Sequence, residues 1–168
     1  MKKSLLVLFL STTLFACTNN DNSAKQEIFD RNVTTMNNAL DAFANEDVEA
    51  FGEFFADSLK WVGTGKLTHD DYSSKSLFIE ELNKYFSLYH DHTIRDRKIT
   101  AGSVYSTDQP SNDPNQLQIF GNRYHIHSGS SKEVGHKWMA VVHFNQDGKI
   151  DYFSDFFDFT GFLKQHED

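Results

Sequence analysis

The sequence predicts an α+β fold in which a curved antiparallel sheet packs against helices, and three observations carry this prediction. Apolar residues recur at helical spacing between residues 27 and 89, interrupted by one short strand and a polar loop. After residue 92 the spacing changes to the two-residue alternation of strands. The helical and strand patterns do not interleave as βαβ units would, so helices and strands are expected to segregate into separate layers.

The start of the chain has the character of an export signal. Lys2 and Lys3 precede a short apolar run, Leu5 to Leu10, and the segment ends in LFAC, residues 14–17. This stretch resembles the lipobox of bacterial lipoproteins, whose cysteine is lipidated and becomes the first residue of the mature chain. The alternative is an ordinary secretory signal with an incidental cysteine. Cys17 is the single cysteine, so an internal disulfide is excluded.

Cleavage before Cys17 would divide the chain into a signal peptide over 1–16, a polar tether over 17–26 and one domain over 27–168. The acyl chains on Cys17 would supply the membrane attachment. The prediction is an exported protein anchored to the bacterial cell envelope, at the periplasmic face of the outer membrane.

The charge and the aromatic content narrow the choice of partners. The formal net charge is −8, which disfavours nucleic acid as a partner, because phosphates require Lys and Arg. Aromatic residues make up 14% of the chain, with 16 Phe. Such an excess of bulky side chains suits a cavity that binds a small molecule, although a dense core would also use it.

The helical part begins with an amphipathic helix over 27–44. Asp47 is a natural N-cap for a second helix over 48–56. A short strand over 59–62 and a polar loop over 63–75 lead to a third helix over 77–89. The apolar stripe of the first helix consists of Phe29, Val33, Met36, Leu40 and Phe43.

Four strands are expected to follow, with turn-rich connections between them. A loop holds both prolines of the chain, and Asp147-Gly148 is typical of a hairpin turn with positive φ. A terminal helical turn is expected over 160–165. The predicted strands span 93–106, 117–128, 135–144 and 149–157.

The third of these strands is apolar on both faces. Its even positions carry Trp138, Ala140, Val142 and Phe144, and its odd positions carry Lys137, Met139, Val141 and His143. Because a sheet face that carries apolar residues is usually covered, we expect a second copy of the chain to cover the outer face, giving a homodimer.

The last strand places a carboxylate among phenylalanines. Alternation puts Asp151, Phe153, Asp155 and Phe157 on one face and Ile150, Tyr152, Ser154 and Phe156 on the other. A carboxylate in such surroundings is costly to bury unless it has a partner or is protonated.

The order of elements resembles the nuclear transport factor 2-like superfamily, and its SnoaL-like branch in particular. The resemblance lies in DVEAFGEFFADSLKW at 47–61 and in FNQDGKIDYFSDFFD at 144–158. It implies a cystatin-like cone, in which a curved antiparallel sheet packs around the N-terminal helices and leaves a pocket inside. The fold hosts many chemistries, so it implies a pocket and not a reaction.

The resemblance also implies a site. Polyketide cyclases of this branch place a catalytic aspartate a few residues after GKI, a position that Asp155 matches. The general-base aspartate of ketosteroid isomerases would fall at Gly63 and their oxyanion-hole tyrosine near Ala39, so both are absent. Asp155 is therefore the candidate general acid or base; the alternative is a structural hydrogen-bond acceptor. His136 is a weak candidate partner, the alternative being an exposed histidine at a strand end. The expected pocket residues are Phe153, Phe157, Trp138, Trp61, Tyr72 and Tyr124.

The remaining histidines do not form a familiar metal motif. His125 and His127 share one face of a strand, and the opposite face, with Phe120, Tyr124 and Ile126, resembles the core side. His125 and His127 are therefore expected on the outer face. No metal or cofactor is expected, because no HExxH motif, cysteine ligand set or glycine-rich phosphate loop is present in the sequence.

Three functional hypotheses follow from these observations. The first is a lipid-anchored domain that binds a small apolar or amphiphilic ligand without firm catalytic activity. The second is an enzyme of the cyclase, isomerase or dehydratase type that uses Asp155. The third is a dimeric accessory or scaffold module that works through its outer sheet face.

Overall fold

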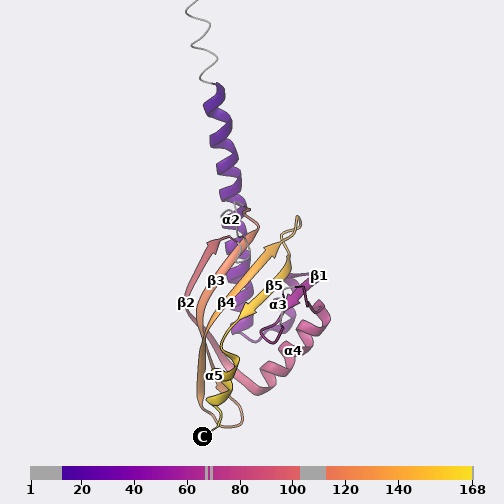
Figure 1. Ribbon diagram of the computed structural model, residues 1–168, viewed down its shortest axis with the longest axis vertical. Helices are drawn as coiled ribbons and strands as arrows, with labels where there is room; N and C mark the ends of the chain where they lie inside the picture. Colours follow the sequence, from indigo (N-terminus) through magenta and orange to yellow (C-terminus); the bar gives the residue numbers. More distant parts are fainter. Residues whose placement is uncertain (1–12, 67, 69, 103–112, 168) are drawn as a thin grey trace, which may run out of the picture.

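A computed structural model describes residues 13–66, 68, 70–102 and 113–167, and side chains from Asn22 onward. Its sheet has five strands in the order β1-β5-β4-β3-β2 (Figure 1). The strands are β1 (Phe55–Val62), β2 (Tyr89–Ala101), β3 (Gln116–His127), β4 (Glu133–Phe144) and β5 (Ile150–Phe156). The helices are α2 (Thr13–Ala44), α3 (Val48–Glu53), α4 (Lys75–Leu88) and α5 (Phe159–Lys164).

The α+β fold with a curved sheet confirms the predicted class, with one correction. Strands β2 to β5 pair antiparallel, but β1 runs parallel to β5, so the sheet is mixed. The parallel pair arises because the chain passes through α4 and the three strands of the meander before β5 returns beside β1.

The boundaries of the helices partly match those predicted from the sequence. Asp47 caps α3 by accepting a hydrogen bond from the backbone N–H of Ala50 at 2.9 Å, as predicted. The helix ends at Glu53 and β1 begins at Phe55, so the strand is longer than the predicted 59–62. Helix α4 passes directly into β2 at Tyr89, which is why β2 begins before the predicted residue 93.

Helix α2 begins at Thr13, earlier than the predicted residue 27, and its first turns extend beyond the sheet (Figure 1). The segment 17–26, expected as a tether, is helical and continuous with it. The side chain of Cys17 lies outside the described side chains, so its lipidation stays a prediction. In the described part of the chain, no helix combines the length and the apolar character needed to cross a bilayer.

The core lies between the inner face of the sheet and helices α2, α3 and α4. Even-numbered residues of β4 face inward, and they pack with Leu117 and Ile119 of β3 and with Phe153 of β5. The helices contribute Met36, Leu40, Phe43, Phe51, Phe78 and Leu82. Helix α5 covers one end of the sheet, where Phe162 packs against Tyr89 and Val134.

Two β-bulges bend β2 around this core. The pairing of β2 with β3 shifts by one residue between His90 and Thr93 and again between Arg95 and Lys98. Asp91 and Asp96, which lie within these shifts, both have a φ of 54°. A bulge increases the local twist and bends the strand, so this sequence produces the curvature of the sheet at two defined points.

A third shift corrects the predicted face pattern of β5. Phe144 pairs with Ile150 and His143 pairs with Tyr152, so Asp151 is the extra residue of a bulge. Ile150 is therefore buried in the core with Phe153, whereas the carboxylate of Asp151 pairs with the His143 ring at 2.6 Å. Strict alternation misplaces Asp151 and Ile150 because it assumes an unbroken strand.

The predicted outer position of His125 is also wrong. His125 is buried at 1% exposure, as are Leu117 and Ile119 on the same face of β3, whereas Phe120 on the opposite face is 36% exposed. The sequence pattern misleads here because the inner face of β3 carries Arg123 and His125, which read as solvent-facing residues.

Candidate functional site

The sheet, helices α2 to α4 and the start of α5 line an open cavity of about 640 Å³. This volume lies within the range of small-molecule sites. Eight of its lining residues are aromatic, namely Phe43, Phe51, Trp61, Phe78, Tyr85, Phe153, Phe157 and Phe159. Its polar and charged lining residues include Ser73, Glu81, Arg123, His136, Asp155 and the loop residues Thr64 and Lys66.

Asp155 projects from β5 into this cavity. The Oδ1 atom of its carboxyl group is buried and has no hydrogen-bond partner among the described residues. Burial raises the pKa of Asp155, and the charge of Arg123 and the indole N–H groups of Trp61 and Trp138 oppose that rise. Neither indole nitrogen makes a hydrogen bond of normal geometry within the described structure, so both are free to bond a shifted carboxylate or a ligand.

Arg123 lies on β3 beside Asp155. Its guanidinium carbon lies 3.8 Å from the ring centroid of Trp138 and 4.7 Å from that of Phe43. The side chain is buried, its Nε has no hydrogen-bond partner, and no carboxylate of the described chain lies within ion-pair distance. Burial lowers the pKa of Arg123, while Tyr85 and Asp155 raise it. A buried cation without a bonded anion is costly, so an anionic oxygen in the cavity would be stabilised here.

His136 lies on β4 directly opposite Arg123 in the β3–β4 pairing. Its ring lies 4.4 Å from the ring of Phe157 and 4.9 Å from that of Phe162. Burial and then the charge of Arg123 lower the pKa of His136 to about 4, so the ring is neutral at pH 7. Both ring nitrogens are buried and, in the described structure, lack a hydrogen-bond partner.

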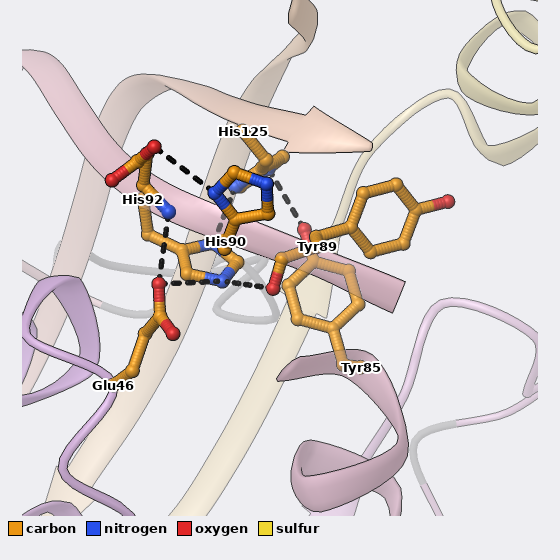
Figure 2. Close-up of polar contacts among 7 residues, drawn as sticks. Glu46, Tyr85, Tyr89, His90, His92 and His125 are labelled. Carbon is orange, nitrogen blue, oxygen red and sulfur yellow. Dashed lines mark hydrogen bonds and ion pairs between the residues drawn. The ribbon is translucent and has the colours of Figure 1, made fainter. Parts of the chain in front are cut away.

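A chain of polar side chains leads away from the cavity (Figure 2). The hydroxyl of Tyr85, which lines the cavity, lies 2.8 Å from Nε2 of His125. Nδ1 of His125 lies 2.6 Å from Nδ1 of His92, and Nε2 of His92 lies 3.1 Å from the backbone oxygen of Tyr89. Nε2 of His92 also lies 4.0 Å from the carboxylate of Glu46. In the described residues, no three metal-ligating side chains gather closely enough to hold an ion.

Comparison with solved structures identifies the architecture. A proposed polyketide cyclase from Xanthomonas campestris pv. campestris superimposes with a TM-score of 0.67 at 14% identity, over 82% of this chain and 98% of the other. A nuclear transport factor 2-like protein from Burkholderia thailandensis superimposes with a TM-score of 0.57 at 15% identity, over 82% and 97%. This chain has the nuclear transport factor 2-like fold.

Another structure with this fold is SalBIII, an epoxide hydrolase/cyclase-like enzyme of pyran ring formation in salinomycin. It matches with a TM-score of 0.60 at 18% identity, over 83% of this chain and 95% of the other. No protein-family model and no curated protein sequence matches the chain. At these identities the likeness concerns the fold, and the chemistry must be argued from the residues in the cavity.

Within the nuclear transport factor 2-like fold, the structure brings five of the predicted site residues to the cavity wall: Asp155, His136, Phe153, Phe157 and Trp61. Trp138 lies behind the wall, where its buried ring supports Arg123 and its indole N–H faces Asp155. Gly63, where a steroid isomerase would carry its base, also lines the cavity, and Ala39 is buried in the core.

Two predicted pocket residues lie elsewhere. Tyr72 is 52% exposed, with the ammonium of Lys60 5.1 Å from its ring, so it packs on the surface. Tyr124 projects from the opposite face of β3, beneath the guanidinium of Arg95 at 4.1 Å. The prediction for Tyr124 was wrong for the same reason as that for His125, since the inner face of β3 was assigned to the wrong residues.

The cavity and its surroundings also contain residues that the sequence pattern does not single out. Arg123 is a lone cation on the strand face of Leu117 and Ile119, and this is the signal that could have found it. Tyr85 reads as an ordinary core position of an amphipathic helix. His92 and His125 lie far apart in sequence, and only the β2–β3 pairing brings them together.

Proposed function

We propose that this domain binds a small, largely apolar molecule with a carbonyl or hydroxyl group and that Asp155 performs acid–base chemistry on it. The observation that carries the proposal is a carboxyl group in an aromatic cavity whose buried Oδ1 has no hydrogen-bond partner among the described residues. Its pKa feels the charge of a buried arginine that no described carboxylate pairs with. Perturbed titratable groups of this kind concentrate at functional sites.

Arg123 has the chemistry to stabilise negative charge on a ligand oxygen. Its guanidinium is held by two aromatic rings and not by a carboxylate, so its N–H groups are available to the cavity. Removal of a proton from carbon next to a carbonyl group creates an enolate oxygen. A preorganised cation in a cavity with little water stabilises such an oxygen more strongly than water does.

Asp155 has the surroundings of a general base or acid. Burial raises the pKa of Asp155 toward the pH of the surroundings, where a carboxyl group transfers protons to and from a ligand most effectively. His136, neutral and without a hydrogen bond, lies on the neighbouring strand and could accept or donate one to the ligand. The resemblance in fold to a proposed polyketide cyclase and to a cyclase-like enzyme of ring formation supports this choice over binding without chemistry.

The test measures proton abstraction directly. The purified domain is incubated in D2O with 2-tetralone, an apolar ketone with acidic hydrogens next to its carbonyl, and deuterium uptake is followed by proton NMR. We expect catalysed uptake by the wild type and a loss of about 100-fold or more in Asp155→Asn. Binding of the fluorescent probe 8-anilinonaphthalene-1-sulfonate is measured in parallel.

The matched control is Asp151→Asn. Asp151 lies on the same strand, but its carboxylate pairs with His143 on the outer side of the sheet, and the change should leave deuterium uptake intact. Probe binding without any catalysed uptake by the wild type would refute the enzymatic part and leave a binding protein.

We also propose that the domain works at the bacterial cell envelope, anchored through lipid on Cys17, as the LFAC motif indicates. Cys17→Ser should move the protein from the membrane fraction to the soluble fraction of its host cells, measured by immunoblot. A wild-type protein that is itself found only in the soluble fraction would contradict the anchor.

A further inference from the structure

The polar chain of Figure 2 has a definite direction, which follows from the chemistry of its members. A backbone carbonyl can only accept, so Nε2 of His92 carries the hydrogen that is donated to the oxygen of Tyr89. A neutral imidazole has one N–H, so Nδ1 of His92 is bare and accepts from Nδ1–H of His125. Nε2 of His125 is then bare and accepts from the hydroxyl of Tyr85.

The neutral state of both rings agrees with their surroundings. Burial and then the neighbouring histidine lower the pKa of His125 to about 2, and burial lowers that of His92 as well. Every hydrogen bond of the chain therefore points from the cavity toward the surface. The hydrogen bonds from Tyr85 through the two histidines to the oxygen of Tyr89 therefore form without a charged member.

The two ends of the chain lie in different environments. Tyr85 lines the cavity, and its oxygen retains lone pairs that a ligand hydroxyl could use. Glu46, at the other end, has a side chain that is 35% exposed, and its carboxylate lies 4.0 Å from Nε2 of His92. The same carboxylate accepts a hydrogen bond from the backbone N–H of Asp91 at 2.8 Å.

The backbone around the outer end is held in a sparsely populated conformation. Glu46 has a φ of 58° and Asp91 has a φ of 54°, values that are unfavourable for residues other than glycine. These two turns hold Glu46 against β2. Strain of this kind is concentrated at functional sites, so it supports a role for the Glu46 end.

We propose that Tyr85, His125, His92 and Glu46 form a proton relay that removes the proton of a ligand hydroxyl, an enol or a phenol, from the cavity. This inference rests on the proposed function and specifies it, because it names the acidic group of the ligand. Arg123 would stabilise the oxygen anion that the relay leaves behind.

The transfer balances in one pass. The ligand O–H bond breaks and its proton binds to the oxygen of Tyr85, whose own proton moves to Nε2 of His125. The Nδ1 proton of His125 moves to Nδ1 of His92, and the Nε2 proton of His92 moves to the carboxylate of Glu46, which closes the 4.0 Å gap by a side-chain movement. The ligand becomes an anion, Glu46 becomes neutral, and both histidines stay neutral with inverted tautomers. Glu46 then releases its proton to solvent. A second proton, taken up later at Glu46 and passed inward to an anionic oxygen in the cavity, restores both tautomers and resets the chain.

The inversion of tautomers separates a relay from a structural histidine pair. Nitrogen-15 NMR of the histidine rings, on the full mature chain, reports which ring nitrogen carries the hydrogen. In the free protein we expect the hydrogen on Nδ1 of His125 and on Nε2 of His92. Saturation with 4-nitrophenol, which ionises readily and changes its absorbance when it does, should move the hydrogen to Nε2 of His125 and to Nδ1 of His92.

Two tyrosines provide the matched variants. Tyr85→Phe keeps the ring and removes the first link, so 4-nitrophenol should bind without inversion of the tautomers. Tyr89→Phe removes a neighbouring hydroxyl that bonds His166 at 3.0 Å and lies outside the relay, so inversion should persist. If 4-nitrophenol binds the wild type and the tautomers do not invert, the relay is refuted. If 4-nitrophenol does not bind in the millimolar range, the proposed function of the cavity fails, and the relay with it.

Discussion

Individual charged and polar residues of the cavity lie where burial destabilises their charged form. This shifts their pKa values and makes them suited to proton transfer or to binding an oxygen anion. Burial raises the pKa of Asp155, so the folded state holds this proton more tightly than the unfolded chain does. The folded state therefore loses stability as pH rises through the folded pKa of this group. Arg123 is also buried, and no carboxylate among the described residues bonds to it. Both costs are met by an extensive aromatic core, and they prepare the cavity for an oxygen-bearing ligand.

The buried histidines predict a pH dependence of stability. The pKa values of His92, His125 and His136 are lowered from 6.5, so the folded state keeps these rings neutral where the unfolded chain takes up a proton on each. Stability should be complete above about pH 6.5 and should fall as pH decreases toward 4, by about 1.4 kcal/mol per pH unit near pH 5 for each ring that stays neutral in the folded state. Urea unfolding at pH 7 and pH 5 measures this slope.

His136→Asn should reduce the slope by about one proton, or 1.4 kcal/mol per pH unit. His90→Asn, a change at a partly exposed histidine, serves as its control. Equal free energies of unfolding at pH 7 and pH 5 would contradict the inferred neutrality of the buried rings.

At the scale of the elements, β-bulges decide which side chains reach the cavity. The two bulges of β2 turn His92 inward toward His125, and the bulge at Asp151 brings both Ile150 and Phe153 into the core. The site therefore depends on a few residues that interrupt regular pairing. Substitutions at these residues should act through the backbone.

Asp96 provides a test of that dependence. Its φ of 54° disfavours a β-branched residue, and its carboxylate accepts a hydrogen bond from the side chain of Asn122 at 2.8 Å. Asp96→Val should destabilise the fold by about 2 kcal/mol, measured by chemical denaturation. Asp96→Gly loses the same hydrogen bond but tolerates the positive φ, so it should cost less than Asp96→Val. Equal costs for the two variants would mean that the conformation at this bulge is not the cause.

At the scale of the whole molecule, the outer face of the sheet carries a row of apolar side chains. Phe120, Met139 and Phe156 are paired across β3, β4 and β5, and Phe120 is 36% exposed. The homodimer expected from the sequence would cover this row. This stays a proposal, and it also offers the surface that a scaffold module would use.

Met139→Glu should convert such a dimer into a monomer, because a carboxylate would be buried without a partner at the centre of the row. Multi-angle light scattering measures the mass. Leu88→Glu, at an apolar residue of α4 that is 52% exposed, is the control for added charge. A wild-type protein that is monomeric at high micromolar concentration would exclude this dimer.

The sequence by itself determined the order of the elements and the α+β class, because spacing, capping residues and turns act locally along the chain. It also indicated Asp155, through the position that follows GKI and through the phenylalanines beside it. These features can be predicted from the sequence because each depends on residues only a few positions away along the chain.

Only the tertiary structure decided which residues share the cavity. A bulge shifts the inward set by one residue, and alternation alone cannot show where it occurs. The inner face of β3 carries Arg123 and His125, whose burial makes sense only beside Asp155 and His92, residues contributed by other strands. Polar groups can line an interior when partners distant in sequence, or a ligand, form hydrogen bonds with them. Such partners come together only when the chain folds.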